Sequence, residues 1–250
     1  MENDAGSRLS LSIVVPVYDE EASVAPLYRE ICEAIGEGGE SAEIIWVDDG
    51  SRDASRERLL EIAAKDERVR VLALDGNHGQ SAALAAGFAY ARGDWVVTLD
   101  GDLQNDPADI PRLLARRNGV DCVNGIRARR HDSLLRRGSS WVANRARNWI
   151  TGDRDTDVGC SLRVMRRELL VGVHAFRGMH RFLPTLLRLE GARTVEVEVS
   201  HRPRRHGASK YGLHNRLWVG LVDLWAVRWM QRRALRYRVT ECGGGPRTKR

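Results

Sequence analysis

The feature that most constrains the fold is an alternation, through the first half of the chain, of short apolar runs with segments of helical periodicity. The apolar runs predict strands at residues 12–17, 43–47, 69–74, 95–99 and 121–125. The segments between them predict helices at 21–35, 53–65, 79–91 and 107–116. This order is typical of an α/β fold with a mostly parallel sheet and helices on both faces. Because ligands of such sheets bind beyond the carboxyl ends of the strands, we expect the site there.

Beyond residue 125 the pattern changes to arginine-rich helices that contain tryptophan. The predicted elements are helices at 138–151 and 180–190, a strand at 194–199, a basic loop at 201–212 and a helix at 213–238. We expect a flexible N-terminus at 1–8 and a disordered basic tail at 239–250, since both are polar, Gly-rich or charged. The main predicted unit therefore spans 9–212.

Composition places the chain among soluble globular proteins. Of its 250 residues, 42% are hydrophobic and 30% are charged, which excludes a disordered or collagen-like chain. The cysteines, Cys32, Cys122, Cys160 and Cys242, are widely spaced and form no Cys-x-x-Cys pair. Neither a zinc site nor a disulfide framework is indicated, so we expect a reducing cytoplasm.

The net charge of +6 conceals two opposed halves. Residues 1–110 hold nine basic and 23 acidic side chains, whereas residues 111–250 hold 31 basic and 11 acidic ones. We interpret the first part as able to hold a cation and the second as meeting an anion. Nucleic acid, a phosphorylated ligand and an anionic membrane all remain open at this point.

No segment of the sequence has the pattern of a signal peptide or a membrane span. The first ten residues are polar and acidic, and the most apolar later stretch, 217–230, is interrupted by Asp223 and Arg228. A membrane helix needs about 20 apolar residues. We therefore expect any membrane contact to be peripheral.

The strongest chemical signal is Asp100-Gly101-Asp102-Leu103-Gln104, directly after the apolar run 95–99. Two carboxylates this close repel each other unless a cation or hydrogen-bond donors offset the charge. Mg²⁺ and Mn²⁺ prefer carboxylate, amide and phosphate oxygens, so Asp100, Asp102 and Gln104 are candidate metal ligands. The alternative is an Asp-rich turn in which Asp106 and Pro107 start a helix.

Two further strand ends carry polar groups suited to a nucleoside. The segment Val47-Asp48-Asp49-Gly50-Ser51 offers carboxylates for a base or ribose, although Ser51 or Asp53 could simply cap a helix. The segment Pro16-Val17-Tyr18-Asp19-Glu20 offers a ring that can stack on a base, although a turn followed by a helix is the plainer interpretation.

Together these motifs resemble those of family 2 glycosyltransferases with the nucleotide-diphospho-sugar-binding GT-A fold, and most of all the polyprenyl-phosphate sugar transferases. The resemblance covers about residues 9–238. Besides the three strand ends it rests on the segments 77–80 (NHGQ), 124–127 (NGIR), 156–163 (TDVGCSLR) and 204–211 (RRHGASKY). Their shared order and spacing make the resemblance specific.

The resemblance implies a set of site residues. Those implied for the base and ribose are Pro16, Tyr18, Glu20, Val47 and Asp49, with Asp48 beside them; those for the diphosphate and a Mg²⁺ or Mn²⁺ ion are Asp100, Gly101, Asp102 and Gln104. The cations implied for the donor diphosphate and the acceptor phosphate are Arg127, Arg204 and Lys210, with Ser209 in the same loop. The implied catalytic residues are Asp102, Arg127, Arg204 and Lys210. Two departures are that Asp19 replaces the usual Asn and that no stretch of this sequence has the pattern of the C-terminal pair of membrane helices common in bacterial members. We therefore expect another mode of membrane attachment.

The chemistry of the reaction agrees with an arginine-rich second half. A phosphate monoester is already ionised near neutral pH and needs no general base, but it needs cations to align it with the donor diphosphate. The candidates for the acceptor phosphate are Arg127, Arg136, Arg137, Arg202, Arg204 and Ser209, although any single Arg could belong to a solvated face. We expect Asp157 to orient sugar hydroxyls or to pair with Arg163; with a hydroxyl acceptor it would be the base.

The last predicted helix carries Trp218, Leu221, Val222, Trp225 and Trp229 on one stripe, followed by arginines. Tryptophan beside a basic cluster is typical of a helix lying on an anionic membrane, and core packing is an equal alternative.

The sequence therefore predicts an inverting, metal-dependent transfer of a hexosyl group, mannose or else glucose, from GDP-mannose or a UDP-hexose to a polyprenyl phosphate. Aminoarabinose is a further alternative for the sugar. We expect this transfer to take place at the cytoplasmic face of the membrane. Association into a homo-oligomer or with a membrane-protein partner is compatible with the sequence. The alternatives are a hydroxyl acceptor or, in another class, a basic nucleic-acid-binding protein. The latter leaves the strand-end carboxylates unexplained, so we expect no nucleic-acid partner.

Overall fold

A computed structural model describes residues 9–39, 41–127, 145, 147–153, 155–203 and 216–234. The strands are β1 (Leu11–Val17), β2 (Ala42–Asp48), β3 (Val69–Ala73), β4 (Trp95–Thr98), β5 (Cys122–Arg127), β6 (Arg163–Arg166) and β7 (Thr194–Val199). The α-helices are α1 (Glu21–Gly38), α2 (Ser55–Ala63), α3 (Gln80–Tyr90), α4 (Ile110–Leu114), α6 (Arg167–Leu170), α7 (Leu183–Leu189) and α8 (Arg216–Arg233). Two 3₁₀ turns are η1 (Pro107–Asp109) and η2 (Met179–Arg181).

The strands form one mixed sheet in the order β3-β2-β1-β4-β6-β5-β7. Strands β1 to β4 pair in parallel, as the sequence predicts. Strand β6 runs antiparallel to both of its neighbours, β4 and β5, and β7 pairs in parallel with β5. The sheet is therefore mostly parallel with one reversed strand inside it.

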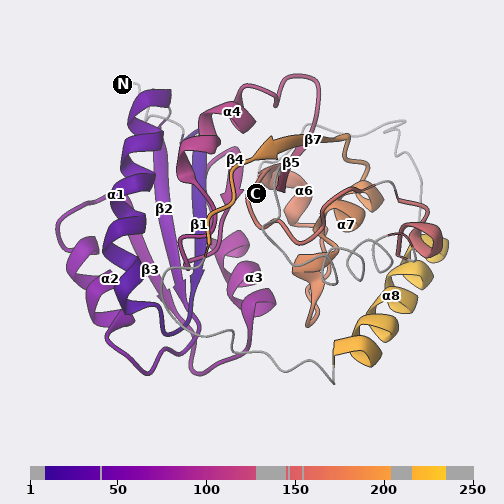
Figure 1. Ribbon diagram of the computed structural model, residues 1–250, viewed down its shortest axis with the longest axis horizontal. Helices are drawn as coiled ribbons and strands as arrows, with labels where there is room; N and C mark the ends of the chain where they lie inside the picture. Colours follow the sequence, from indigo (N-terminus) through magenta and orange to yellow (C-terminus); the bar gives the residue numbers. More distant parts are fainter. Residues whose placement is uncertain are drawn as a thin grey trace, which may run out of the picture.

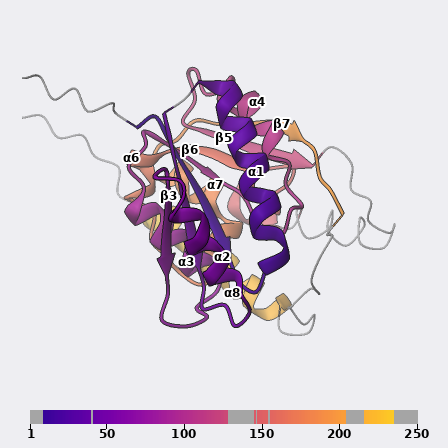
Figure 2. The ribbon, with the colours of Figure 1, turned by 90° about the vertical axis from the view of Figure 1, so that its left-hand side faces the viewer.

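Helices cover both faces of this sheet (Figures 1 and 2). Alternate residues of β1 separate the two apolar clusters: Ile13 and Val15 lie in the cluster that includes α1, α2 and α4, and Val14 lies in the one that includes α3, α7 and α8. Since side chains alternate across a strand, strands buried on both faces read as continuous apolar runs. Figure 1 shows α8, in yellow, at the edge of the molecule opposite α1 and α2.

The sequence prediction misses β6 and misplaces several helix ends. Strand β6 has arginine at both ends and only Val164 and Met165 between them, so no apolar run marks it; it forms because Val164 pairs with Val97 on one side and Val123 on the other. The predicted helix at 53–65 begins only at Ser55. The predicted helix at 180–190 is instead η2 followed by α7, with Pro184 in the first turn of α7.

Other predicted segments fall wholly or partly outside the described residues. These are the two chain ends, 1–8 and 239–250, and most of the predicted helix at 138–151, of which 147–151 is helical. The last helix is described from Arg216 to Arg233, with side chains from Gly220 onward.

The sheet brings three strand ends to one edge. Val17 at the end of β1 pairs with Asp48 at the end of β2, and the Asp49 N–H donates to the Val17 carbonyl at 2.8 Å. On the other side of β1, Val14 pairs with Thr98 at the end of β4. The polar residues directly after these strands therefore lie beside one another.

Candidate functional site

A cleft of about 290 Å³ lies at this edge of the sheet. It is lined by Pro16, Val17, Tyr18, Glu20, Asp49, Asn77, Gln80, Asp100, Gly101 and Asp102. Seven of these were predicted from the strand-end motifs, and the cleft contains all three motifs. The structure thus brings an aromatic ring, carboxylates and amides together in one concave site.

The turn after β4 holds Asp100 and Asp102 in a fixed arrangement. Leu103 adopts a left-handed conformation with φ of 63° while its side chain is buried, a conformation that costs energy for a non-glycine residue. The Asp100 N–H donates to the side chain of Asn105 at 3.1 Å, and the Gln104 N–H donates to Asp102 Oδ1 at 3.1 Å. Buried side chains and backbone hydrogen bonds therefore impose the turn.

Asp100 is an electrostatically destabilised carboxylate. Burial raises the pKa of Asp100 to about 6, and the neighbouring charge of Asp102 raises it as well. Gln80, at the start of α3, donates from Nε2 to Asp100 Oδ1 at 2.7 Å and so stabilises the ionised form. A cation between Asp100 and Asp102 would relieve the remaining repulsion.

The donor set fits a hard divalent cation that a phosphate ligand helps to bind. Asp100 and Asp102 both line the cleft, and carboxylate oxygens suit Mg²⁺ or Mn²⁺. Within the described residues no cluster of three or more His, Cys, Asp or Glu side chains is arranged to hold a metal ion. The two aspartates would therefore need substrate oxygens to complete the coordination. The predicted third ligand, Gln104, is not among the residues that line the cleft, and its Nε2 lies 3.5 Å from the Arg202 carbonyl.

Asp49 fixes the loop that forms one wall of the cleft. Its two carboxylate oxygens accept hydrogen bonds from the N–H groups of His78 and Gly79, each at 2.8 Å. The loop approaches closely because Gly50 has a positive φ of 73°, and a Cβ there would lie 2.6 Å from the Gly76 carbonyl carbon. Asp49 thus connects the end of β2 to the start of α3.

The other two residues predicted from this strand end do not line the cleft. Val47 is fully buried in the core beneath α3. Asp48 is also fully buried, where it forms an ion pair of 2.6 Å with Arg56 of α2 and accepts from the Ser51 N–H at 3.0 Å. Its role is to hold the loop between β2 and α2. Of the two predicted caps, Ser51 does not bond to α2, since its Oγ accepts from the Asp19 N–H. Asp53 Oδ1 instead accepts from the N–H of Ser55, the first residue of α2, at 3.0 Å.

Asp157 pairs with Arg127 and not, as one alternative had it, with Arg163. The Arg127 guanidinium donates to both carboxylate oxygens of Asp157, at 2.7 and 2.8 Å. The Gly159 N–H also donates to Asp157, at 3.1 Å. Arg163 instead donates to the carbonyls of His180 and Val158, at 3.0 and 2.9 Å. This bidentate pair fixes Arg127 at the end of β5.

Arg202 lies beside the aspartate turn but is engaged by protein carboxylates. Its guanidinium forms ion pairs of 2.7 Å with Glu30 of α1 and with Asp106. Its backbone N–H donates to the Gln104 carbonyl at 2.9 Å. These contacts place Arg202 as a clamp on the turn. Asp106 also accepts from the Ala108 N–H and caps η1, so the helix-starting interpretation of that residue is confirmed.

Several predicted residues lie outside the described part of the chain. These are Arg136, Arg137, Arg204, Ser209 and Lys210.

A smaller chamber of about 140 Å³ lies next to the cleft and shares Gln80 and Asp100 with it. Its other lining residues include Thr98, Ser161, Arg163, His180 and Arg181. Burial lowers the pKa of His180 to about 3, and Arg181 and Arg163 lower it too. The imidazole is therefore neutral at physiological pH, and its Nδ1 lies 2.8 Å from Ser81 Oγ.

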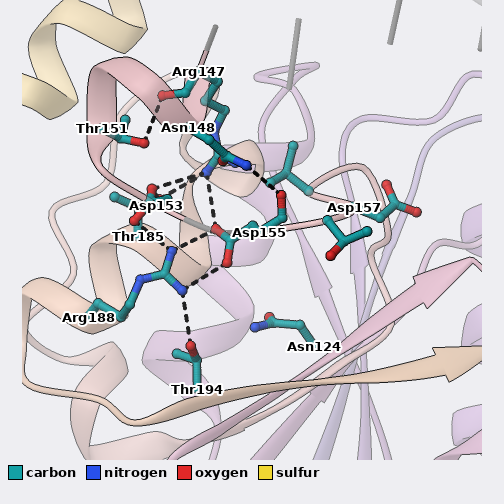
Figure 3. Close-up of polar contacts among 12 residues, drawn as sticks. Asn124, Arg147, Asn148, Thr151, Asp153, Asp155, Asp157, Thr185, Arg188 and Thr194 are labelled. Carbon is teal, nitrogen blue, oxygen red and sulfur yellow. Dashed lines mark hydrogen bonds and ion pairs between the residues drawn. The ribbon is translucent and has the colours of Figure 1, made fainter. Parts of the chain in front are cut away.

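A buried ionic cluster supports the segment that carries Asp157 (Figure 3). Arg188 of α7 contacts both oxygens of Asp155, at 2.9 and 2.6 Å, and also Asp153 at 2.9 Å. Arg147 lies 3.8 and 3.6 Å from Asp153 and Asp155 respectively. Burial lowers the pKa of Arg147, whereas Asp155 and Asp153 oppose that change. The cluster anchors the chain two residues before Asp157.

Sequence reasoning missed several residues of the site. Asn77 and Gln80 belong to the recognised segment 77–80, and its position before a small-residue helix was the available signal. Nothing in the sequence pointed to His180 and Arg181, because only the packing of η2 against α3 brings them to the site.

Comparison with known proteins identifies the family. Residues 12–172 match the glycosyl transferase family 2 domain. The chain belongs to glycosyl transferase family 2. It is 47% identical over 204 residues to an undecaprenyl-phosphate 4-deoxy-4-formamido-L-arabinose transferase of Pseudomonas aeruginosa, covering 80% of this chain and 60% of that protein. The family 2 chain thus spans about three-fifths of that relative's length.

Other similar proteins agree with this assignment. A dodecaprenyl-phosphate galacturonate synthase of Rhizobium johnstonii is 39% identical over 236 residues, covering 92% of this chain and 70% of that protein. Glucosyl-3-phosphoglycerate synthase of Mycobacterium tuberculosis, solved with UDP, has a TM-score of 0.64 at 21% identity, covering 90% of this chain and 80% of that one. The latter likeness concerns the fold alone, which is the predicted GT-A fold.

We predict that Asp155→Asn destabilises this family 2 domain, because it removes a charge from a buried cluster and leaves two arginines to share Asp153. The expected loss is about 3 kcal/mol in the free energy of unfolding. Urea denaturation measures it. The matched control is Arg193→Ala, which removes an ion pair between Asp121 and an arginine that is 67% exposed and should cost less than about 1 kcal/mol. Equal effects of the two variants would contradict the anchoring role.

Proposed function

We propose that this chain transfers a sugar from a nucleoside diphosphate to a polyprenyl phosphate, with inversion at the anomeric carbon. The observation that carries the proposal is the cleft in which Tyr18, Glu20 and Asp49 lie beside Asp100 and Asp102. Such a site offers a surface for a base, acceptors for a ribose and a place for a cation at the diphosphate. Similarity to two polyprenyl-phosphate enzymes supports the acceptor.

In this proposal the described residues divide into three roles. Tyr18 stacks on the base and Glu20 holds its polar edge, while Asp49 keeps the cleft wall in place through His78 and Gly79. Asp100 and Asp102 would hold Mg²⁺ or Mn²⁺, which supplies positive charge to the leaving diphosphate. Solved M. tuberculosis glucosyl-3-phosphoglycerate synthase structures contain Mn²⁺ with UDP, which supports a divalent ion here.

The acceptor phosphate meets the arginines of the second half. Arg127, oriented by Asp157, presents a guanidinium at the end of β5, and Arg204 and Lys210 follow the segment that Arg202 fixes beside the aspartate turn. A phosphate ionised near neutral pH attacks without a general base. Asp157 therefore orients Arg127, and its alternative role as a base belongs to a hydroxyl acceptor.

The nucleotide and the sugar of the proposal follow from the similar proteins. Solved structures of similar fold contain UDP or UDP-glucose, which supports a UDP donor over GDP-mannose. The names of the two relatives specify formamidoarabinose and galacturonate, neither of which is the predicted mannose or glucose. We therefore propose a UDP-sugar that is neither of those hexoses.

The test of this function compares two lipids that differ only in the phosphate. We expect transfer to a polyprenyl phosphate and at least about a hundredfold less transfer to the matching polyprenol, because the arginines need an anionic partner. Radiolabelled sugar recovered in the lipid phase measures both. Equal transfer to the two lipids would favour the hydroxyl acceptor with Asp157 as base.

Replacing one metal-binding candidate should abolish transfer without unfolding the domain. Asp102→Ala is expected to lower the rate about a hundredfold or more, because it removes a half-buried carboxylate from the turn after β4 and leaves the core intact. Binding of Mn²⁺ in the presence of UDP should fall in parallel. Glu168→Ala, at an exposed site on α6, is the control. An Asp102→Ala protein that binds Mn²⁺ and turns over normally would disprove the assignment.

We also propose that α8 lies on the membrane that holds the lipid acceptor. Its inner side packs through Leu224 and Val227, whereas Val222, Trp225 and Trp229 are each more than 60% exposed. Arg232 and Arg233 follow at its end. An exposed apolar stripe with tryptophan and adjacent arginines suits an interfacial helix. Of the described helices, none is both long and apolar enough to span a bilayer.

Membrane contact through α8 predicts a loss of vesicle binding in the double variant Trp225→Ser/Trp229→Ser. Flotation with phosphatidylglycerol vesicles should show at least about tenfold weaker binding than the unaltered chain. The control is Leu60→Ser, an exposed apolar residue of α2 on the other side of the sheet. If the double variant floats as well as the control, α8 does not supply the contact.

A further inference from the structure

The chamber beside the cleft has an unusual charge environment. Arg163 of β6 lines it and is only 3% exposed, yet its guanidinium donates to two backbone carbonyls, those of His180 and Val158. Among the ion pairs of the described residues, none joins Arg163 to a carboxylate. Asp100 interacts with Arg163 electrostatically, but the hydrogen bonds of the guanidinium go to carbonyls, so an anion bound directly to it in the chamber would stabilise it further.

A second cation lines the chamber from η2. Arg181 donates to Asp223 of α8 at 2.9 Å, so one carboxylate holds it in place at the chamber wall. Asp100, which the chamber shares with the cleft, is the only acidic residue among the described lining side chains. The described lining therefore holds two guanidiniums and one carboxylate. Asp223, outside the lining, offsets Arg181, so Arg163 is the guanidinium of this described lining without a direct carboxylate partner.

His180 adds a neutral hydrogen-bonding group to the same lining. Ser81 Oγ accepts from the Gly178 N–H at 3.0 Å, which leaves its own proton free to donate to His180 Nδ1 at 2.8 Å. With Nδ1 as acceptor, the neutral ring carries its proton on Nε2. The imidazole is then a donor without adding charge.

From this charge environment we infer that the chamber binds the sugar of the donor and selects one that bears a carboxylate, a hexuronic acid. The inference rests on the proposed function. If the diphosphate lies at Asp100, the sugar bonded to it has to lie close to that residue as well. Gln80 and Asp100 suit its hydroxyl groups, while Arg163 and Arg181 suit its carboxylate. Arg163 and Arg181 are thereby specificity-determining residues.

The acceptor phosphate is a less suitable occupant. The chamber adjoins the diphosphate end of the cleft, so the donor itself brings a C5 carboxylate there. The acceptor has its own guanidinium in Arg127, which Asp157 holds at the end of β5. An anion carried by the donor sugar accounts for the two chamber arginines without removing Arg127 from the acceptor.

The test compares UDP-galacturonate with UDP-galactose, which differ only by a carboxylate in place of a hydroxymethyl group. Isothermal titration with Mg²⁺ present should give a Kd at least about tenfold lower for the uronate, as one charge-assisted hydrogen bond would provide. UDP alone is the third ligand. If UDP does not bind, the proposed function fails; if UDP binds and the two sugars have equal Kd values, only the chamber inference fails.

Variants of the two arginines test whether a preference for UDP-galacturonate arises in the chamber. Arg181→Gln should reduce the uronate preference to about threefold or less while leaving the Kd of UDP unchanged, because Arg181 does not line the nucleotide cleft. Arg163→Gln should have the same effect. Because Arg163 is buried, Arg163→Gln can fail to fold, and in that case Arg181→Gln decides the test. Arg193→Gln, an exposed arginine on the far edge beside β7, controls for general charge.

Three results would overturn the inference. One is full uronate preference in Arg181→Gln, and another is an equal loss in Arg193→Gln. The third is a loss of geranyl phosphate binding in Arg181→Gln with UDP-galacturonate binding intact, which would place the acceptor phosphate in the chamber instead.

Discussion

The site depends on the parallel register of β1 between β2 and β4. Because Val17 pairs with Asp48 and Val14 pairs with Thr98, the chain leaves all three strands at one edge of the sheet. Apolar residues on both faces of β1 fix this register, since a slip by one residue would exchange the faces to which Ile13 and Val14 point. The positions of Tyr18, Asp49 and Asp100 depend on it.

Strain and repulsion at that edge are offset by bonds from neighbouring segments. Leu103 is held with a positive φ, and Asp100 is buried beside Asp102. Gln80 donates to the Asp100 carboxylate, and the Asp100 N–H donates to the Asn105 side chain. Arg202 holds the turn through its ion pair with Asp106. The rest of the fold thus maintains a concentration of negative charge suited to a cation.

The basic half of the chain divides its charge in a comparable way. Arg147, Arg188 and Arg202 are paired with carboxylates and stabilise the structure, and Arg127 is oriented by Asp157. Arg163 differs because its guanidinium donates to carbonyls. A surplus of arginine in the sequence is therefore partly structural, and burial and pairing distinguish those available to a ligand.

The sequence by itself determined the strands β1 to β4, the edge of the sheet that bears the site and seven of the residues that line the cleft, because these depend on local apolar runs and on the polar residues directly after each run. Tertiary structure alone decided that Asp49 faces the cleft while Asp48 is buried against Arg56, since adjacent residues leave a strand in opposite directions. It also decided the insertion of β6, the pairing of Asp157 with Arg127, and the chamber formed by Arg163, His180 and Arg181. These features join segments that are far apart in the sequence, and only the packing of the elements determines which side chains meet.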